Sequence, residues 1–223
     1  ALDEKIAAGI PFDAITRNIG RGRISALAVS ATRVATGQCV VFVQRPEADA
    51  PPWSGNPAVD VRRVQIGLDH VRASSAIPFL LPPVTLGDSL YCDGGLRQNV
   101  PLSPALHLGA KRIVVVTAQS AARDTSMARS RLRHFAGPVF LLGKTMNAVL
   151  EESVDEDLRR LERVNEIIDA GTRRYGPRFL EAIGSDLPRG REPRRIEAVA
   201  IRPSESIGRL AAEYVRSRAF SRR

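Results

Sequence analysis

Apolar positions along the chain fall into short runs with different spacings, and these spacings predict a mixture of helices and strands. Residues 1–19 carry apolar side chains at near-helical intervals and are expected to form a helix. Two apolar runs rich in β-branched residues follow at 24–37 and 38–46. Because a Thr-Gly pair separates them, the pattern predicts a hairpin or two adjacent buried strands.

The middle of the chain alternates between loop-forming and periodic segments. Residues 46–60 contain four prolines and no apolar period, which predicts a loop. Apolar residues then recur at positions 61, 64, 68 and 71, the spacing of one face of a helix. The prolines of the next stretch, 77–95, exclude a continuous helix and favour a loop with short strands.

A short helix followed by a strand is expected after residue 100. Pro101 suits the first turn of a helix, since its missing N–H is not needed there, and Gly109 suits a left-handed helix end. The run Ile113–Val116 is wholly apolar, as in strands buried on both faces of a parallel sheet. Together they form half of a βαβ unit.

The last hundred residues predict a long helix, a strand and a final helix. Residues 144–170 are amphipathic, with Gly171 placed past their end, and residues 194–203 resemble a closing strand. No repeat or clear linker divides the chain. We therefore expect a single domain over 1–223, with a core in 1–120 and a helical extension with the closing strand and helix in 121–223.

The net charge of the chain excludes few classes of binding partner. The chain has 33 basic and 24 acidic residues, giving a net charge of +9, and all but three of the basic residues are arginine. Arginine binds phosphate well, so an anionic membrane surface is one expected partner. Since the arginines are scattered and only 5% of residues are aromatic, a solvated basic surface is favoured and no nucleic acid is expected.

The sequence contains no apolar run of the length that spans a bilayer, so we expect a soluble or peripheral protein, with the cytoplasm favoured. Cys39 and Cys92 both lie in strand-like runs and are expected to be buried thiols, although a disulfide between them stays open. No set of residues has metal-ligand spacing, and neither a metal nor a cofactor is expected.

The clearest chemical motif is Asp93-Gly94-Gly95, which follows a strand-like run and precedes Asn99-x-Pro101. A carboxylate within hydrogen-bond reach of a hydroxyl can act as a general base. The glycines would let the backbone turn without a Cβ in the way. Taken alone, the motif would favour a structural aspartate in a β-turn, with glycine supplying positive φ; together with its neighbours in the sequence it does not.

Three phrases in this order resemble the patatin-like phospholipase family: ISALAVSATRVATGQCVVF, RASSAIPFLLPPV and YCDGGLRQNVPLSPALHLGAKRIVVV. The segment IRPSESIGRLAAEYV also looks like the closing strand and helix of bacterial members. The resemblance implies an α/β fold of three layers, with a central, mostly parallel sheet flanked by helices. It also implies that this chain lacks the N-terminal strands of that fold.

The resemblance implies a serine acyl hydrolase without a catalytic histidine. In this family the serine of a G-x-S-x-G motif attacks an acyl ester, and the aspartate of the D-G-G motif takes its proton. By this match Asp93 is the dyad base, supported by Gly94, Gly95 and Asn99. The implied substrates are acyl esters of phospholipids, lysophospholipids or simpler lipids, and the implied process is lipid degradation.

The nucleophile is missing from this sequence, which contains neither G-x-S-x-G nor a glycine-rich oxyanion loop. The serines considered as substitutes are Ser30, Ser54, Ser74, Ser75 and Ser89, and none has support; Ser74 and Ser75 are expected to pack and cap a helix. The histidines His70, His107 and His134 offer no triad. We therefore expect the C-terminal part of a hydrolase, with the serine on a partner polypeptide or a preceding segment.

Two other interpretations remain open. The chain could be a non-catalytic module with a remnant patatin-like fold that binds lipid or protein. A nucleic-acid-binding role rests on charge alone and ranks last.

Overall fold

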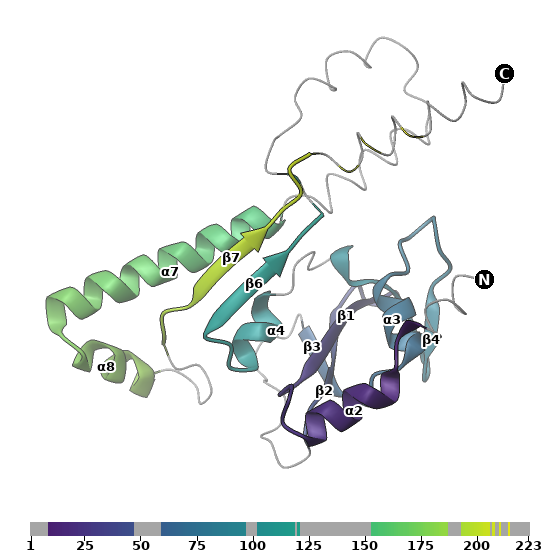
Figure 1. The fold of residues 1–223 in the computed structure, drawn as a ribbon, viewed down its shortest axis with the longest axis horizontal. Coiled ribbons are helices and arrows are strands. Elements are labelled where there is room, and N and C mark those ends of the chain that lie inside the picture. Colours follow the sequence, from purple (N-terminus) through teal and green to yellow (C-terminus); the bar gives the residue numbers. More distant parts are fainter. Residues whose placement is uncertain are drawn as a thin grey trace, which may run out of the picture. The chain divides into compact units, whose positions relative to one another are not determined.

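The computed structural model describes residues 9–46, 59–96, 102–118, 120, 153–186 and 193–205, together with 207, 210 and 214. The chain divides into two compact units (Figure 1). The first comprises Ala1–Ala110 and Gly171–Pro193, and the second comprises Lys111–Ala170 and Arg194–Arg223. Whether they act as the single domain expected over 1–223 stays a prediction.

The first unit contains a five-stranded mixed sheet with the order β3-β2-β1-β5-β4. The strands are β1 (Leu27–Arg33), β2 (Cys39–Gln44), β3 (Val59–Arg63), β4 (Val84–Leu86) and β5 (Ser89–Asp93). Only β2 and β3 pair in parallel; β1 pairs antiparallel with both β2 and β5, and β4 pairs antiparallel with β5. The α/β class is as expected, but this sheet is not mostly parallel, because every neighbouring pair in it except β2–β3 is antiparallel.

The predicted hairpin over 24–46 is confirmed. Leu27 pairs with Gln44 at one end of the β1–β2 ladder, and Thr32 pairs with Cys39 at the other. The connecting turn contains Gly37 at φ 64°, a left-handed conformation that glycine adopts without steric cost. All six residues of β2 are buried, as expected for a strand between two neighbours with both faces covered.

The helix predicted from positions 61, 64, 68 and 71 is wrong over its first half. Residues Val59–Arg63 form strand β3, and the helix α3 begins only at Leu68 and ends at Ser74. Val61 pairs with Val41 of β2, and Arg63 pairs with Val43. The β-branched valines of this segment suit a strand, and pairing with a buried neighbour outweighs a helical spacing that four positions share by chance.

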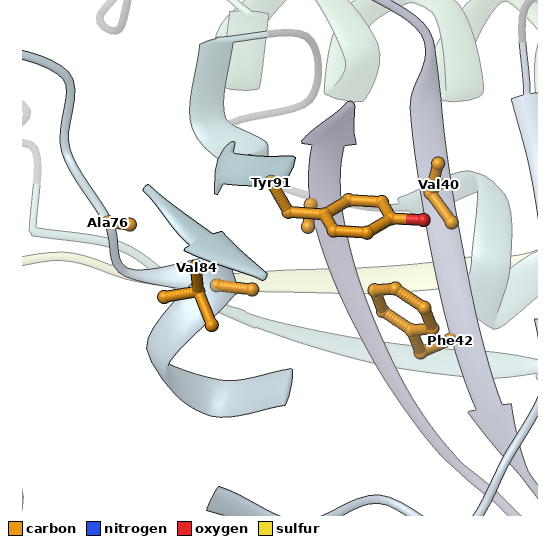
Figure 2. Packing of buried hydrophobic residues seen from close by; sticks show 7 residues of the cluster. Val40, Phe42, Ala76, Val84 and Tyr91 are labelled. Carbon is orange, nitrogen blue, oxygen red and sulfur yellow. The ribbon is translucent and has the colours of Figure 1, made fainter. Parts of the chain in front are cut away.

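One face of the sheet packs against α3. Ala31 and Tyr91 from the paired strands β1 and β5 are completely buried with Val40 and with Ala73 of α3. Figure 2 shows the Tyr91 side chain reaching toward Val40 with the Phe42 ring beside it, and the rings of Phe42 and Tyr91 meet edge to face at a centroid distance of 5.4 Å. Such aromatic pairs add to the free energy gained from burial.

The opposite face carries Cys39, Val41 and Val43, against which Leu108 packs. Leu108 follows the short helix α4 (Leu102–His107), and Gly109 ends this segment at φ 95°. The predicted helix with a glycine end is therefore confirmed; Pro101 itself lies outside the described residues.

The first unit contains two further helices, one near its N-terminal end and one in its C-terminal segment. Helix α2 (Phe12–Gly20) begins after Pro11, so the helix expected over 1–19 is present only in its second half within the described residues. Gln44 of β2 donates to Thr16 of α2 at 2.8 Å, and it accepts from the backbone N–H of Ile66 at 2.9 Å. Helix α8 (Arg178–Asp186) also belongs to this unit.

The second unit contains a parallel pair, β6 (Arg112–Val116) and β7 (Glu197–Ile201), beside most of helix α7 (Ser153–Tyr175) (Figure 1). Asn165 of α7 binds both backbone groups of Ile196, donating to its oxygen at 2.7 Å and accepting from its nitrogen at 2.9 Å. This two-point contact fixes the start of β7 against the helix. Arg202 and Asp155 form an ion pair just past the other end of β7.

Two expectations about this unit need correction. Strand β6 is buried on one face only: Val115 is buried, whereas Val114 and Val116 are exposed. Helix α7 also continues through Gly171 to Tyr175 and does not end before the glycine. At Gly171 the absence of a Cβ makes room for the ring of Phe179 from α8, so the glycine serves close packing of two helices.

Candidate active site

The candidate base Asp93 is the last residue of β5, and the glycines after it open a single turn of 3₁₀ helix, Gly94–Leu96. Sheet pairing therefore holds Asp93 in place, and the backbone leaves the sheet at Gly94. Asp93 lies opposite Ala31 of β1. Its side chain is half-buried, between the packed sheet and solvent.

Two hydrogen bonds hold the backbone of Asp93. Its N–H donates to the carbonyl oxygen of Ala76, which follows α3, at 3.0 Å. Its carbonyl oxygen accepts a hydrogen bond from the Thr32 hydroxyl of β1, also at 3.0 Å. Because Ala76 and Thr32 are themselves buried, the position of the aspartate is set by packed structure and not by a surface loop.

The carboxylate of Asp93 is oriented by the turn that follows it. Oδ1 accepts a hydrogen bond from the backbone N–H of Gly95 at 2.8 Å. No residue of the described ranges donates to Oδ2. A carboxylate has acceptor positions for about four hydrogen bonds, so this one keeps capacity for a further donor, such as a hydroxyl group.

Gly94 allows the turn to lie directly on strand β1. A Cβ at position 94 would lie 2.7 Å from the carbonyl carbon of Ser30 and 3.1 Å from its Cβ. Such distances are shorter than van der Waals contact allows, and only glycine fits without a shift of backbone. The second glycine, Gly95, supplies the N–H that binds Oδ1. The close contact with Ser30 accounts for glycine at position 94, whereas the hydrogen bond at position 95 uses only a backbone group.

Among the described residues, none of the serines weighed as substitute nucleophiles is hydrogen-bonded to the Asp93 carboxylate. Ser30 is buried, and strand alternation places its side chain on the opposite sheet face from Ala31 and Asp93. Ser75 donates to the carbonyl oxygen of Val71 at 3.0 Å, a helix-capping contact of the kind expected. Ser89 pairs with Leu86 across the tight β4–β5 hairpin. Ser54 lies outside the described residues.

The two histidines within the described ranges, His70 and His107, make contacts that hold local structure together. Nδ1 of His70 accepts from the backbone N–H of Gly67 at 3.2 Å, and its ring meets Phe42 edge on at 4.9 Å. Burial lowers the pKa of His70, which Asp69 offsets only in part, so the ring is neutral at pH 7. Nδ1 of His107 lies 2.8 Å from the carbonyl oxygen of Ser103. His134, like Asn99 and Arg97, lies outside the described residues.

The two cysteines are thiols and not a disulfide. Cys39 is buried and Cys92 is half-buried, next to the candidate base. Burial raises the pKa of the Cys92 thiol, and the negative charge of Asp93 raises it further. Cys92 is therefore protonated at neutral pH and unsuited to be a nucleophile.

The sheet carries an ion pair between Arg33 and Asp60 that the sequence did not predict. Arg33 of β1 donates to Asp60 of β3 at 2.6 Å and to the Gln38 side chain at 2.9 Å. Burial would raise the pKa of Asp60, but hydrogen bonds from Arg33 and Arg62 outweigh it and leave that pKa below its usual value. Arg33 lies opposite Tyr91, two residues before Asp93. Both charged residues are visible in the sequence, Arg33 at the end of a strand-like run and Asp60 at the end of the predicted loop, but the strand order β3-β2-β1 was needed to bring them together.

Among the residues that the structure describes, no group of three His, Cys, Asp or Glu side chains is placed to hold a metal ion. None of the helices within the described ranges is long and apolar enough to cross a bilayer.

Comparison with known proteins points to one family. Residues 1–106 match the model of the patatin-like phospholipase family. "Lysophospholipase NTE1" of Meyerozyma guilliermondii is 35% identical over 72 residues, and that of Cryptococcus neoformans is 37% identical over 68 residues. These alignments cover 32% and 30% of this chain, but 5% and 4% of the fungal proteins.

A longer alignment joins the chain to a bacterial protein. "Uncharacterized protein YjjU" of Escherichia coli is 30% identical over 159 residues, which is 66% of this chain and 39% of YjjU. The chain thus spans a minor part of each of these relatives. The resemblance inferred from the sequence phrases is confirmed by the match over residues 1–106.

Proposed function

Because residues 1–106 belong to the patatin-like phospholipase family, we propose that this chain supplies the aspartate of a serine–aspartate dyad in a lipid acyl ester hydrolase. Asp93 is the general base. The serine lies on another polypeptide segment, either a partner chain or a preceding part of the same protein, because residues 1–223 contain no G-x-S-x-G motif. The substrates are acyl esters of phospholipids or lysophospholipids.

The observation that carries the proposal is the state of the Asp93 carboxylate. One oxygen is held by the Gly95 N–H at 2.8 Å, and the other receives no hydrogen bond from any described residue. The backbone on either side is fixed by Ala76 and Thr32. Proton transfer from a serine hydroxyl requires a base that is oriented in advance and has an oxygen available to the hydroxyl, and among the described residues Oδ2 meets that condition.

The reaction proceeds in two steps. In the first, Asp93 accepts the serine proton while the serine oxygen attacks the ester carbonyl carbon, and the proton then passes to the leaving alcohol as the acyl-enzyme forms. In the second, Asp93 accepts a proton from water, whose oxygen attacks the acyl-enzyme. The fatty acid leaves, and the proton returns to the serine oxygen. The Gly95 N–H holds the carboxylate in place throughout.

The test compares Asp93→Asn with Asp88→Asn in the assembly that contains a G-x-S-x-G segment, using hydrolysis of p-nitrophenyl butyrate. An asparagine at 93 can still accept from the Gly95 N–H, so the turn is preserved, but it cannot take a proton. We expect Asp93→Asn to lower kcat by about 10²- to 10⁴-fold. Asp88 is exposed in the β4–β5 turn, so its amide variant controls for the loss of one charge.

Three results would contradict the proposal. Hydrolysis by Asp93→Asn at the rate of the unchanged assembly would remove Asp93 from the mechanism. Hydrolysis by the isolated 223 residues, lost on mutation of one of their own serines, would show that the nucleophile is in this chain. Lipid or protein binding by an assembly with no hydrolytic activity would favour a non-catalytic module.

A further inference from the structure

The loop between α3 and β4 presents a row of large apolar side chains to solvent. The apolar tip, defined as Phe79, Leu80 and Leu81, has exposed fractions of 77%, 75% and 41%. Single exposed apolar residues are common on protein surfaces, but three consecutive large ones at a loop end are not. Their exposure to water is unfavourable, and a partner that removes them from water would stabilise the loop.

The backbone holds this tip in a defined conformation. The N–H groups of Leu80 and Leu81 both donate to the carbonyl oxygen of Ile77, at 3.1 and 2.9 Å. Phe79 has φ 68°, the left-handed region that a bulky side chain rarely adopts. Prolines on both sides, Pro78 and Pro82, restrict the chain further. The loop thus accepts backbone strain while leaving its largest side chain in solvent, a combination that strained functional loops show.

The base of the same loop touches the candidate active site. The carbonyl oxygen of Ala76, three residues before Phe79, accepts the backbone N–H of Asp93 at 3.0 Å. Ala76 is buried, so the loop starts from the packed core at the residue that positions the base. A partner that contacts the apolar tip would therefore lie close in the chain to the residue that holds Asp93.

We propose that the apolar tip inserts into an anionic phospholipid surface and so brings Asp93 to its substrate. The inference rests on the proposed function for its biological sense, but the binding itself does not require catalysis. The occupant follows from two properties of the chain together: aromatic and aliphatic side chains that enter the acyl region, and a net charge of +9 that attracts anionic headgroups. A basic second copy of this chain would meet repulsion.

The test measures binding of the full 223-residue chain to vesicles of phosphatidylcholine and phosphatidylglycerol by co-sedimentation. The variant is Phe79→Asn with Leu80→Gln. Asparagine tolerates the left-handed backbone of position 79, so the loop keeps its shape while losing its apolar groups. The matched control is Ile167→Gln, which removes an apolar side chain of 64% exposure from α7 in the other unit.

We expect the double variant to bind vesicles at least about tenfold more weakly, because two apolar side chains no longer leave water. The loss should persist at high salt, where attraction between charges is screened but apolar insertion is not. Ile167→Gln should bind like the unchanged chain. Thermal unfolding verifies the fold of each variant, and Leu80→Gln alone gives a readout if position 79 proves intolerant.

Equal vesicle binding by the double variant and the unchanged chain would overturn the proposal. So would a dimer of the unchanged chain that dissociates in the double variant, since the tip would then cover a second copy. Hydrolysis of the soluble ester p-nitrophenyl butyrate by the complete assembly separates the two hypotheses. The tip variant should retain this activity, whereas Asp93→Asn should lose it and still bind vesicles.

Discussion

Gly94 lies directly against the backbone of Ser30, with room for a hydrogen atom and for nothing larger. A Cβ on Gly94 would be 2.7 Å from the carbonyl carbon of Ser30. The turn after Asp93 can therefore follow strand β1 closely only because residue 94 is glycine.

We expect Gly94→Ala to destabilise the protein by about 1–3 kcal/mol, the usual cost of forcing an extra carbon into packed structure. Denaturant unfolding measures this cost. Gly20→Ala is the control, since a Cβ there meets nothing within 4 Å, and it should be neutral or stabilising by up to about 1 kcal/mol. If the two variants have the same stability, the contact with Ser30 does not constrain the turn.

The Arg33–Asp60 ion pair should stabilise the sheet at neutral pH. Asp60→Asn removes the charge that Arg33 binds at 2.6 Å, and because Arg33 is largely buried we expect a loss of about 1–3 kcal/mol at pH 7. Asp69→Asn breaks an exposed pair with Arg72 and should cost at most about 0.5 kcal/mol. Urea unfolding of the three proteins gives the comparison.

The same ion pair predicts a pH dependence. Because the pKa of Asp60 is lower in the folded state than its usual value, its contribution is complete above the unfolded pKa of about 3.9 and is lost as pH falls through the folded pKa. The stability difference between the unchanged protein and Asp60→Asn should therefore shrink below about pH 4. A constant difference down to pH 2 would argue against the depressed pKa.

His70 should make the protein less stable as the solution becomes mildly acidic. Its folded-state pKa lies below 6.5 because the ring is partly buried. The unfolded chain therefore takes up a proton more readily, and stability falls as pH drops through about 6.5. His70→Gln keeps an acceptor for the Gly67 N–H but does not titrate, so its stability should change less between pH 8 and pH 5. Thermal unfolding at several pH values checks this slope.

Cys92 offers a chemical probe of the charge on Asp93. Because burial and the neighbouring carboxylate raise the pKa of the Cys92 thiol, its reaction with iodoacetamide at pH 8 should be slower than that of an exposed cysteine. Asp93→Asn removes the second cause and should accelerate labelling a few-fold. Mass spectrometry of the Cys92 peptide follows the rate. An unchanged rate in a correctly folded variant would mean that the carboxylate does not influence the thiol.

Local chemistry made several elements predictable from sequence. Gly37 marks the β1–β2 turn, Gly109 marks the end of the α4 segment, and the apolar run of β6 marks a strand. The aspartate and glycines of residues 93–95 also stood out, because they follow in order the other phrases that resemble the patatin-like family. In each case the residues that decide the conformation are neighbours in the chain.

Other features depended on partners far away in sequence. Val59–Arg63 is a strand because β2 pairs with it, although its apolar spacing also fits a helix. Val114 is exposed because only one face of β6 is covered, which an apolar run does not reveal. Gly171 continues a helix because Phe179 packs against it, although glycine more often ends one.

The sequence by itself determined the chemistry that this protein carries: an aspartate in a glycine turn, apolar runs that form strands, and the absence of a G-x-S-x-G motif from residues 1–223. Only the tertiary structure decided where that chemistry lies: Asp93 held between Ala76 and Thr32, Arg33 paired with Asp60, and Phe79 left in solvent. Turn and strand preferences are set by neighbouring residues, whereas sheet order and burial depend on contacts between distant segments, whose free energy no short stretch of sequence contains.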